Sequence, residues 1–131
     1  MGHTDGDSVA YFEKARVLHG GDLVWNRVIP YIDVKAGGSP KGHAAALDQI
    51  LRRLPADVKI IPGHGEVMDL EGLRSFRKYF ADLQDAAGKA KSAGVSREEF
   101  LEAADLPAYR DYSGYASRFR DNCAAAYDEA P

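Results

Sequence analysis

The stretch 59-KIIPGHGEVMD-69 decides how the rest of the chain is interpreted. It begins with a short apolar run, passes through Pro-Gly-His-Gly and ends at Asp69, a residue type that often caps a helix. We therefore predict a strand over 58–61 that is buried on both faces, a turn around His64, and a helix from Asp69 onward. A histidine between two glycines at a strand end is either a polar loop residue or a group that the flexible backbone aims at a metal ion.

The segments before this stretch predict a hairpin, a connection and a helix. Two runs of β-branched and aromatic residues, 8–12 and 16–25, are typical of paired strands joined by a tight turn. The pair Gly20-Gly21 interrupts the second run, so we expect a loop rather than a straight strand beyond it. Segment 26–38 contains a proline and scattered apolar residues, which favours an irregular connection.

Three kinds of signal predict four helices. Ser39 followed by Pro40 indicates a helix start, and Pro55 closes that segment. Ser96 and Glu99 form a capping-box pattern that opens a short helix to about residue 104, and a final helix covers 113–129. The helix after Asp69 has an apolar stripe at helical spacing, made of Leu70, Leu73, Phe76, Phe80 and Leu83.

The predicted order, β-β-loop-α-β-α-α-α, indicates an α/β fold with α+β layers. A chain of 131 residues forms one domain, and 45% apolar and 28% charged residues are ordinary for a globular protein. Only three or four strands are visible, so helices on one side of the sheet would leave its other face bare.

Charge and hydropathy exclude some partners. The formal net charge of −3 argues against nucleic acid, and no apolar run is long enough to cross a membrane. The first ten residues do not resemble a signal peptide, and the compartment, cytoplasm or periplasm, stays open. Cys123 is the only cysteine and lies among alanines, as a small buried residue would. No phosphate-binding glycine loop or serine nucleophile motif is present.

Three polar residues stand at predicted strand ends among small residues: His3, Asp22 and His64. Two imidazoles and one carboxylate are a sensible ligand set for zinc or a similar divalent ion. They are far apart in sequence, so only the fold could bring them together. We interpret His43 as a surface helix residue and His19 as a structural or partly exposed strand residue.

Three segments together resemble the C-terminal half of a metallo-β-lactamase-fold hydrolase. They are "GHTDGDSVAYF" (2–12), "VLHGGDLVWN" (17–26) and "AALDQILRRLPADVKIIPGHGEVMD" (45–69), in this order. The resemblance implies an αββα sandwich of two similar halves with a dinuclear zinc site at the sheet edge between them. The chain would be one partial domain, with the ligand-bearing half-sheet and helix in 1–69 and C-terminal helices in 70–131.

By this resemblance His3 binds the first zinc ion, Asp22 bridges two ions and His64 binds the second. Trp25 would line the mouth of the site and contact substrate. Iron and manganese are alternatives to zinc, because histidine and aspartate ligands suit all three metals. The implied reaction is hydrolysis of an ester, thioester or amide (lactam) bond of a small molecule by a metal-bound hydroxide.

One family signature is missing from the chain. The HxHxDH motif, which belongs to the first half of the family fold, does not occur, so we expect an incomplete or inactive site in this chain alone. The bare sheet face predicts a homodimer or a complementing chain that carries the first half. The alternative function is a non-catalytic dimerising half-fold or scaffold module with remnant metal ligands.

Overall fold

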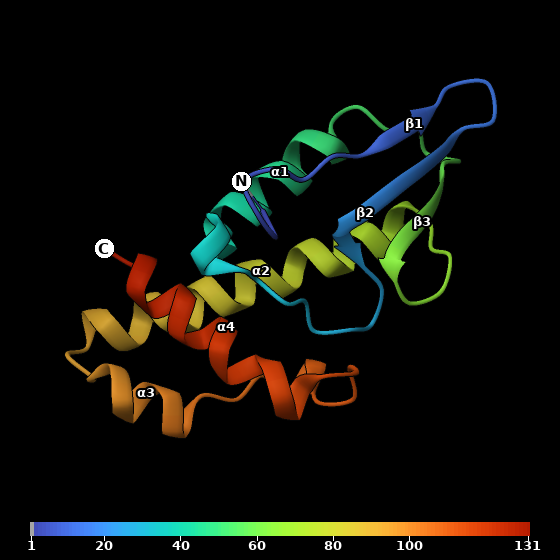
Figure 1. Ribbon diagram of the computed structural model, residues 1–131. Helices are drawn as coiled ribbons and strands as arrows, with labels where there is room; N and C mark the ends of the chain where they lie inside the picture. Colours follow the sequence, from blue (N-terminus) through green and yellow to red (C-terminus); the bar gives the residue numbers. More distant parts are fainter. Residues whose placement is uncertain (1) are drawn as a thin grey trace.

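The computed structural model describes residues 2–131 and has mixed α and β architecture, with three strands and four α-helices in that range. The elements are β1 (Ala10–Phe12), β2 (Val17–Trp25), α1 (Pro40–Leu51), β3 (Lys59–His64), α2 (Leu70–Ser92), α3 (Arg97–Ala103) and α4 (Tyr115–Glu129). Short 3-10 turns cover Val34–Ala36 and Pro107–Tyr109. Figure 1 shows the strands at one end of the molecule, with α3 and α4 at the other. None of the helices described is long and apolar enough to cross a bilayer.

The central strand of the sheet is β2, which pairs antiparallel with β1 and parallel with β3. The predicted hairpin is therefore confirmed. The loop expected after Gly20-Gly21 is wrong, because β2 continues to Trp25. Gly21 has φ +53° and the pairing with β3 shifts register on both sides of it, so the glycines form an irregularity within the strand rather than its end.

The helix starts lie where their capping residues predict them. The side chains of Ser39 and Asp69 accept hydrogen bonds from the backbone N–H groups of Gly42 and Gly72. The capping box of Ser96 and Glu99 has both of its reciprocal contacts. The end of the first helix is the exception, since α1 stops at Leu51, ahead of Pro55.

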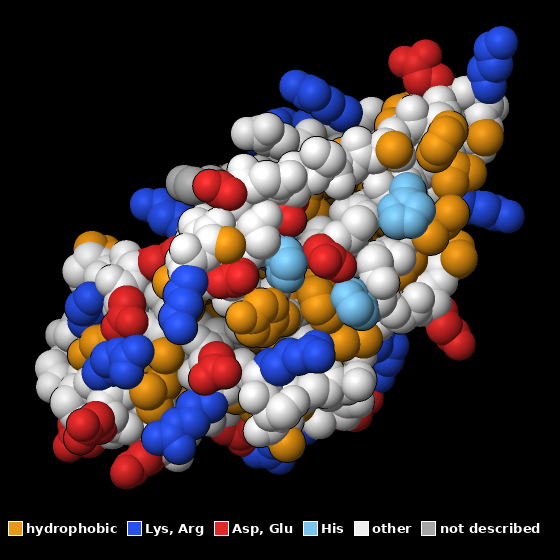
Figure 2. Space-filling model, in the orientation of Figure 1, with side chains coloured by type: hydrophobic (Ala, Val, Ile, Leu, Met, Phe, Trp, Pro, Cys, Tyr) orange, Lys and Arg blue, Asp and Glu red, His pale blue; other side chains and the backbone are white. Residues whose placement is uncertain are grey.

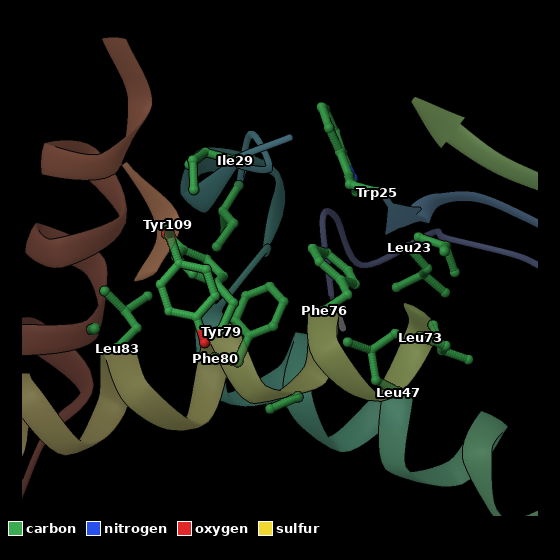
Figure 3. Close-up of a cluster of buried hydrophobic side chains, with 14 of the residues drawn as sticks. Leu23, Trp25, Ile29, Leu47, Leu73, Phe76, Tyr79, Phe80, Leu83 and Tyr109 are labelled. Carbon is green, nitrogen blue, oxygen red and sulfur yellow. The ribbon is translucent and has the colours of Figure 1, made fainter. Parts of the chain in front are cut away.

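The predicted stripe on α2 is confirmed as the centre of the core. Its members are buried, and Tyr79 joins them with no exposed surface. In Figure 3 the labelled side chains of α2 point to the same side, toward Ile29, Tyr109 and Trp25. This helix thus ties the helical layer to the end of β2.

The expectation that β3 is buried on both faces is wrong. Ile60 is fully buried, but its neighbour Ile61 is 38% exposed, so the strand alternates between an inner and an outer face. On the outer face Phe12 of β1 is 58% exposed. Within residues 2–131 the helices cover the inner face, and the outer face keeps apolar side chains in solvent.

Candidate functional site at the sheet edge

Asp22 and His64 meet at the carboxyl ends of two neighbouring parallel strands. Trp25 of β2 is opposite His64 of β3 in the register, so the ends of both strands lie at one edge of the sheet. The His64 Nε2 atom is 3.2 Å from Asp22 Oδ1, and the two side chains are 50% and 46% exposed. An imidazole nitrogen and a carboxylate oxygen therefore face each other at the surface.

The two glycines around His64 have different roles. A Cβ atom on Gly63 would lie 2.5 Å from the carbonyl oxygen of Gly21 and 2.8 Å from Asp22 Oδ1, which is too close for real side chains. Gly63 thus allows β2 to approach β3 closely enough for the contact between Asp22 and His64. Gly65 has φ +96°, a conformation that side chains disfavour, and it turns the chain away after His64.

Trp25 supports both members of this pair. Its ring stacks on the His64 ring with centroids 3.9 Å apart and planes 17° apart. Its indole Nε1–H donates to the backbone oxygen of Asp22 at 2.7 Å. The side chain is only 2% exposed, although it borders a small hollow of about 210 Å³. Trp25 is therefore a packing residue of the site here, and its contact with substrate stays a prediction.

His3 lies near the pair and in contact with a different carboxylate. Its ring centroid is 6.2 Å from that of Trp25 and 5.9 Å from that of Tyr31. Its Nδ1 atom is 3.4 Å from Asp7 Oδ1, and Asp7 also accepts a hydrogen bond from the backbone N–H of Thr4. The structure thus joins Asp22 to His64 and places His3 beside the same tryptophan.

These donors do not by themselves fit a complete zinc site. Among residues 2–131 no group of three or more His, Cys, Asp or Glu side chains is arranged to hold one ion. Catalytic zinc normally has three protein ligands and a water molecule. The pair of Asp22 and His64 supplies two donors, which is fewer than such a site requires.

The interpretation of His43 as a surface residue is wrong. Its side chain is fully buried between α1 and α2, with the ring centroid 4.5 Å from that of Phe80. Its Nε2 atom is 2.7 Å from the backbone oxygen of Leu23, next to Asp22, while Nδ1 has no partner among the described residues. Burial lowers the pKa of His43 to about 4, so the ring is neutral at pH 7. His43 lies four residues before the buried Leu47, so both side chains are on the same face of the helix. This spacing was the sequence signal for the burial of His43.

Two other predictions agree with the structure. His19 is an exposed strand residue whose Nδ1 accepts from the backbone N–H of Gly21. Cys123 is 1% exposed, and burial raises the pKa of its thiol to about 12, which keeps it protonated and unreactive.

Sequence reasoning missed one cation beside the site. The Arg118 guanidinium of α4 lies over the Trp25 ring, 5.5 Å from its centroid. The residues around Arg118 in the sequence do not predict this contact, because Arg118 and Trp25 are far apart in the chain and meet only in the folded structure. Figure 2 shows histidine, acidic, basic and hydrophobic side chains gathered on one face of the molecule.

Comparison with known proteins supports the fold. No family model matches the chain. The chain is 32% identical over 82 residues to a protein of Aquifex aeolicus (strain VF5) named only as uncharacterized, a match that covers 63% of this chain and 38% of that one. The crystal structure of VMB-1, a metallo-β-lactamase, aligns with a TM-score of 0.52 at 23% identity, covering 62% of this chain and 37% of VMB-1.

The fold is similar to that of a metallo-β-lactamase. At this level of identity the likeness concerns the fold alone. The chain spans less than two-fifths of the length of either protein that it matches. The comparison therefore does not show that this chain has the activity of a whole metallo-β-lactamase.

Proposed function

We propose that this chain is part of a metal-dependent hydrolase that acts on an ester, thioester or amide (lactam) bond of a small molecule. It contributes Asp22, His64 and His3 to a metal centre that a further polypeptide segment completes. The observation that carries the proposal is the 3.2 Å contact between His64 Nε2 and Asp22 Oδ1 at the carboxyl ends of two parallel strands.

The surroundings of this contact favour a ligand pair over an ordinary surface ion pair. A surface ion pair contributes little to stability and needs no special support. Here Gly63 makes room for Asp22, and Trp25 fixes the His64 ring by stacking. Such restraint of ring orientation is what a metal ligand requires.

His3 has the same kind of support. With its Nδ1 facing Asp7 at 3.4 Å, its Nε2 is the atom left to act as a ligand. A carboxylate behind a histidine is a common arrangement in metal sites, because it fixes the tautomer and ring orientation. Zinc is the proposed ion, with iron and manganese as alternatives.

Zinc titration of the purified chain by calorimetry tests this proposal. We expect His64→Ala to weaken zinc binding by about tenfold or more, because one of few donors is lost. His19→Ala is the matched control, since His19 is an exposed histidine on β2 that forms no hydrogen bond or ion pair with Asp22 or His64 among residues 2–131. Equal affinity in the wild type and both variants would remove the metal centre from the proposal. With zinc and a polypeptide that carries the first half-fold added, chelator-sensitive hydrolysis of a thioester or chromogenic β-lactam is the corresponding activity assay.

The open face of the sheet requires a partner in this proposal. Phe12 and Ile61 leave apolar surface in solvent, which a homodimer or a complementing chain with the first half-fold would cover. Sedimentation equilibrium distinguishes these partners. A mass twice that of the chain supports the homodimer, and a monomer mass at all concentrations removes it.

A non-catalytic half-fold is the second candidate function. The observation in its favour is that the described residues hold no three-donor group. A chain with a scaffold role would bind zinc no better than His64→Ala does, and hydrolysis would be absent with or without added metal.

A further inference from the structure

The amino ends of β2 and β3 carry an excess of basic side chains. Segments 13–16 and 52–59 together contain five of the 17 Lys and Arg residues of the chain and two of its 20 Asp and Glu residues. The five basic residues are all exposed, and they are Lys14, Arg16, Arg52, Arg53 and Lys59. The rest of the chain is left with 12 basic and 18 acidic residues. The molecule therefore has a positive end although its net charge is −3.

Several features place these two segments side by side. The backbone N–H of Lys59 donates to the backbone oxygen of Arg16 at 3.0 Å, and the Arg16 guanidinium pairs with Asp57. Arg53, just beyond the end of α1, lines the same hollow as Tyr11 of β1. The basic side chains thus surround the turn between β1 and β2, which Figure 1 shows at the end of the molecule farthest from α3.

Three of these cations have no acidic partner. Among residues 2–131, Lys14, Arg53 and Lys59 form no ion pair, whereas Arg16 is neutralised by Asp57. Exposed cations that lie close together and are not paired produce a positive potential that attracts an anionic partner.

Apolar surface accompanies this charge. Tyr11 and Phe12 are 38% and 58% exposed, and successive strand residues point to opposite faces of a sheet. Tyr11 lies on the side of the helices, where a hollow of about 430 Å³ is lined mainly by apolar side chains of β1, β2 and α1. Figure 2 shows hydrophobic side chains over this end of the molecule, with basic side chains around them. Aromatic residues among Lys and Arg are typical of surfaces that lie at the level of lipid headgroups.

We infer that the basic tip, defined as residues 11–16 and 52–59, binds the surface of bilayers that contain anionic phospholipids. Lys14, Arg53 and Lys59 meet the lipid phosphates, and Tyr11 with the apolar hollow beside it contacts the acyl chains below them. A surface of this kind rests on a bilayer without crossing it. A bilayer fits better than a nucleic acid, because a plane touches the tip alone, whereas a long polyanion would also approach the acidic remainder of the chain.

The inference goes beyond the proposed hydrolase and does not depend on it, because the tip and the candidate site lie at opposite ends of the same strands. Asp22 and His64 are at the carboxyl ends, and β2 runs over nine residues from Val17 to Trp25. At the usual rise per strand residue the two ends are roughly 25 Å apart. A chain bound through its tip would therefore hold Asp22 and His64 away from the bilayer, open to water and to a partner segment.

Flotation of the chain with lipid vesicles tests this inference. We expect binding to phosphatidylcholine vesicles only when phosphatidylglycerol is added, and weaker binding as the salt concentration is raised. Lys14→Gln and Arg53→Gln should each lower the affinity about fivefold, the contribution of one basic side chain near an anionic surface.

Two further variants separate charge from apolar contact. Arg120→Gln removes the same charge from an exposed position on α4, far from the tip, and should bind vesicles like the wild type. Tyr11→Ser should weaken binding at low and high salt alike, because the contact of its ring with lipid is not electrostatic. Circular dichroism melting of each variant checks that the fold is intact.

The outcomes separate this inference from its rival and from the metal centre. Equal binding to vesicles without phosphatidylglycerol, or equal affinity in folded Lys14→Gln, Arg53→Gln and Arg120→Gln, overturns it. Binding of a single-stranded oligonucleotide with no binding of vesicles overturns it in favour of nucleic acid. Selective vesicle binding by a chain that fails to bind zinc supports the basic tip and removes only the proposed metal centre.

Discussion

The helical layer and the outer face of the sheet differ in how completely their side chains are partnered. In the helical layer the buried hydroxyl of Tyr79 accepts a hydrogen bond from Asn122, and its ring stands edge-on to that of Phe80. On the outer face of the sheet Phe12 and Ile61 remain in solvent, and all three residues of β1 are exposed. The helices thus close the core against the inner face of the sheet, while the outer face of the sheet that carries Asp22 and His64 stays uncovered.

The largest effect expected from this contrast is on core stability. Phe80 is fully buried, with the rings of His43, Phe76 and Tyr79 around it, so Phe80→Ala should lower the free energy of unfolding by about 3–5 kcal/mol. Phe12→Ala removes the same group from an exposed position and should change it by less than about 0.5 kcal/mol. Urea unfolding followed by circular dichroism measures both values.

A large loss of stability in Phe12→Ala would change the comparison between the outer face of the sheet and the helical layer. If it destabilises the protein by an amount similar to Phe80→Ala, the outer face is covered in solution, and the loss should grow with protein concentration. Such a result would support the homodimer directly.

The next effect depends on pH and comes from the helical layer. Burial lowers the pKa of His43 to about 4 from 6.5, while the hydrogen bond to the Leu23 carbonyl and the charge of Asp7 act in the opposite direction and His3 acts in the same one. The unfolded chain therefore binds a proton at His43 that the folded chain does not. Stability is fully present above pH 6.5 and falls as pH is lowered, by about 3 kcal/mol at pH 4.

Urea unfolding at pH 7, 5.5 and 4.5 tests this dependence, with His43→Gln as the comparison. Glutamine keeps a donor for the Leu23 carbonyl and does not titrate, so the loss of stability between pH 6.5 and 4 should become much smaller. An identical slope in both proteins would show that other groups cause the acid sensitivity. Carboxylates with lowered pKa values, such as Asp48 and Asp128, act mainly below this window.

Helix caps were predictable from the sequence, whereas the burial of single side chains was not. The caps at Ser39, Asp69 and Ser96 use hydrogen bonds to residues three positions away, so the sequence contains both partners. The burial of His43 and the exposure of Ile61 depend on which faces the helices cover, and this is set by the packing of α1 and α2.

The site itself was only partly predictable. The contact of Asp22 with His64 joins two strands that are separated by a helix, and no local spacing encodes it. Their places at predicted strand ends singled these residues out, and the resemblance to a known fold gave each one a role. It did not supply Arg118, which reaches Trp25 from the last helix of the chain.

The smallest effects compare a glycine of the site with a glycine of the helical layer. In Gly63→Ala the new methyl group would meet the Gly21 oxygen and Asp22, and β2 must move away from β3. We expect a loss of about 1–3 kcal/mol in stability, typical of overpacking, and weaker zinc binding because Asp22 is displaced from His64. Gly88 of α2 has open space around it, so Gly88→Ala should stabilise the protein by about 0.5–1 kcal/mol through helix propensity and leave zinc binding unchanged.

Urea unfolding measures the stability of both variants, and calorimetry measures their affinity for zinc. If Gly63→Ala binds zinc like Gly88→Ala, the closeness of Asp22 to His64 has no part in metal binding, and the two residues are only an ion pair at the edge of an unfinished sheet.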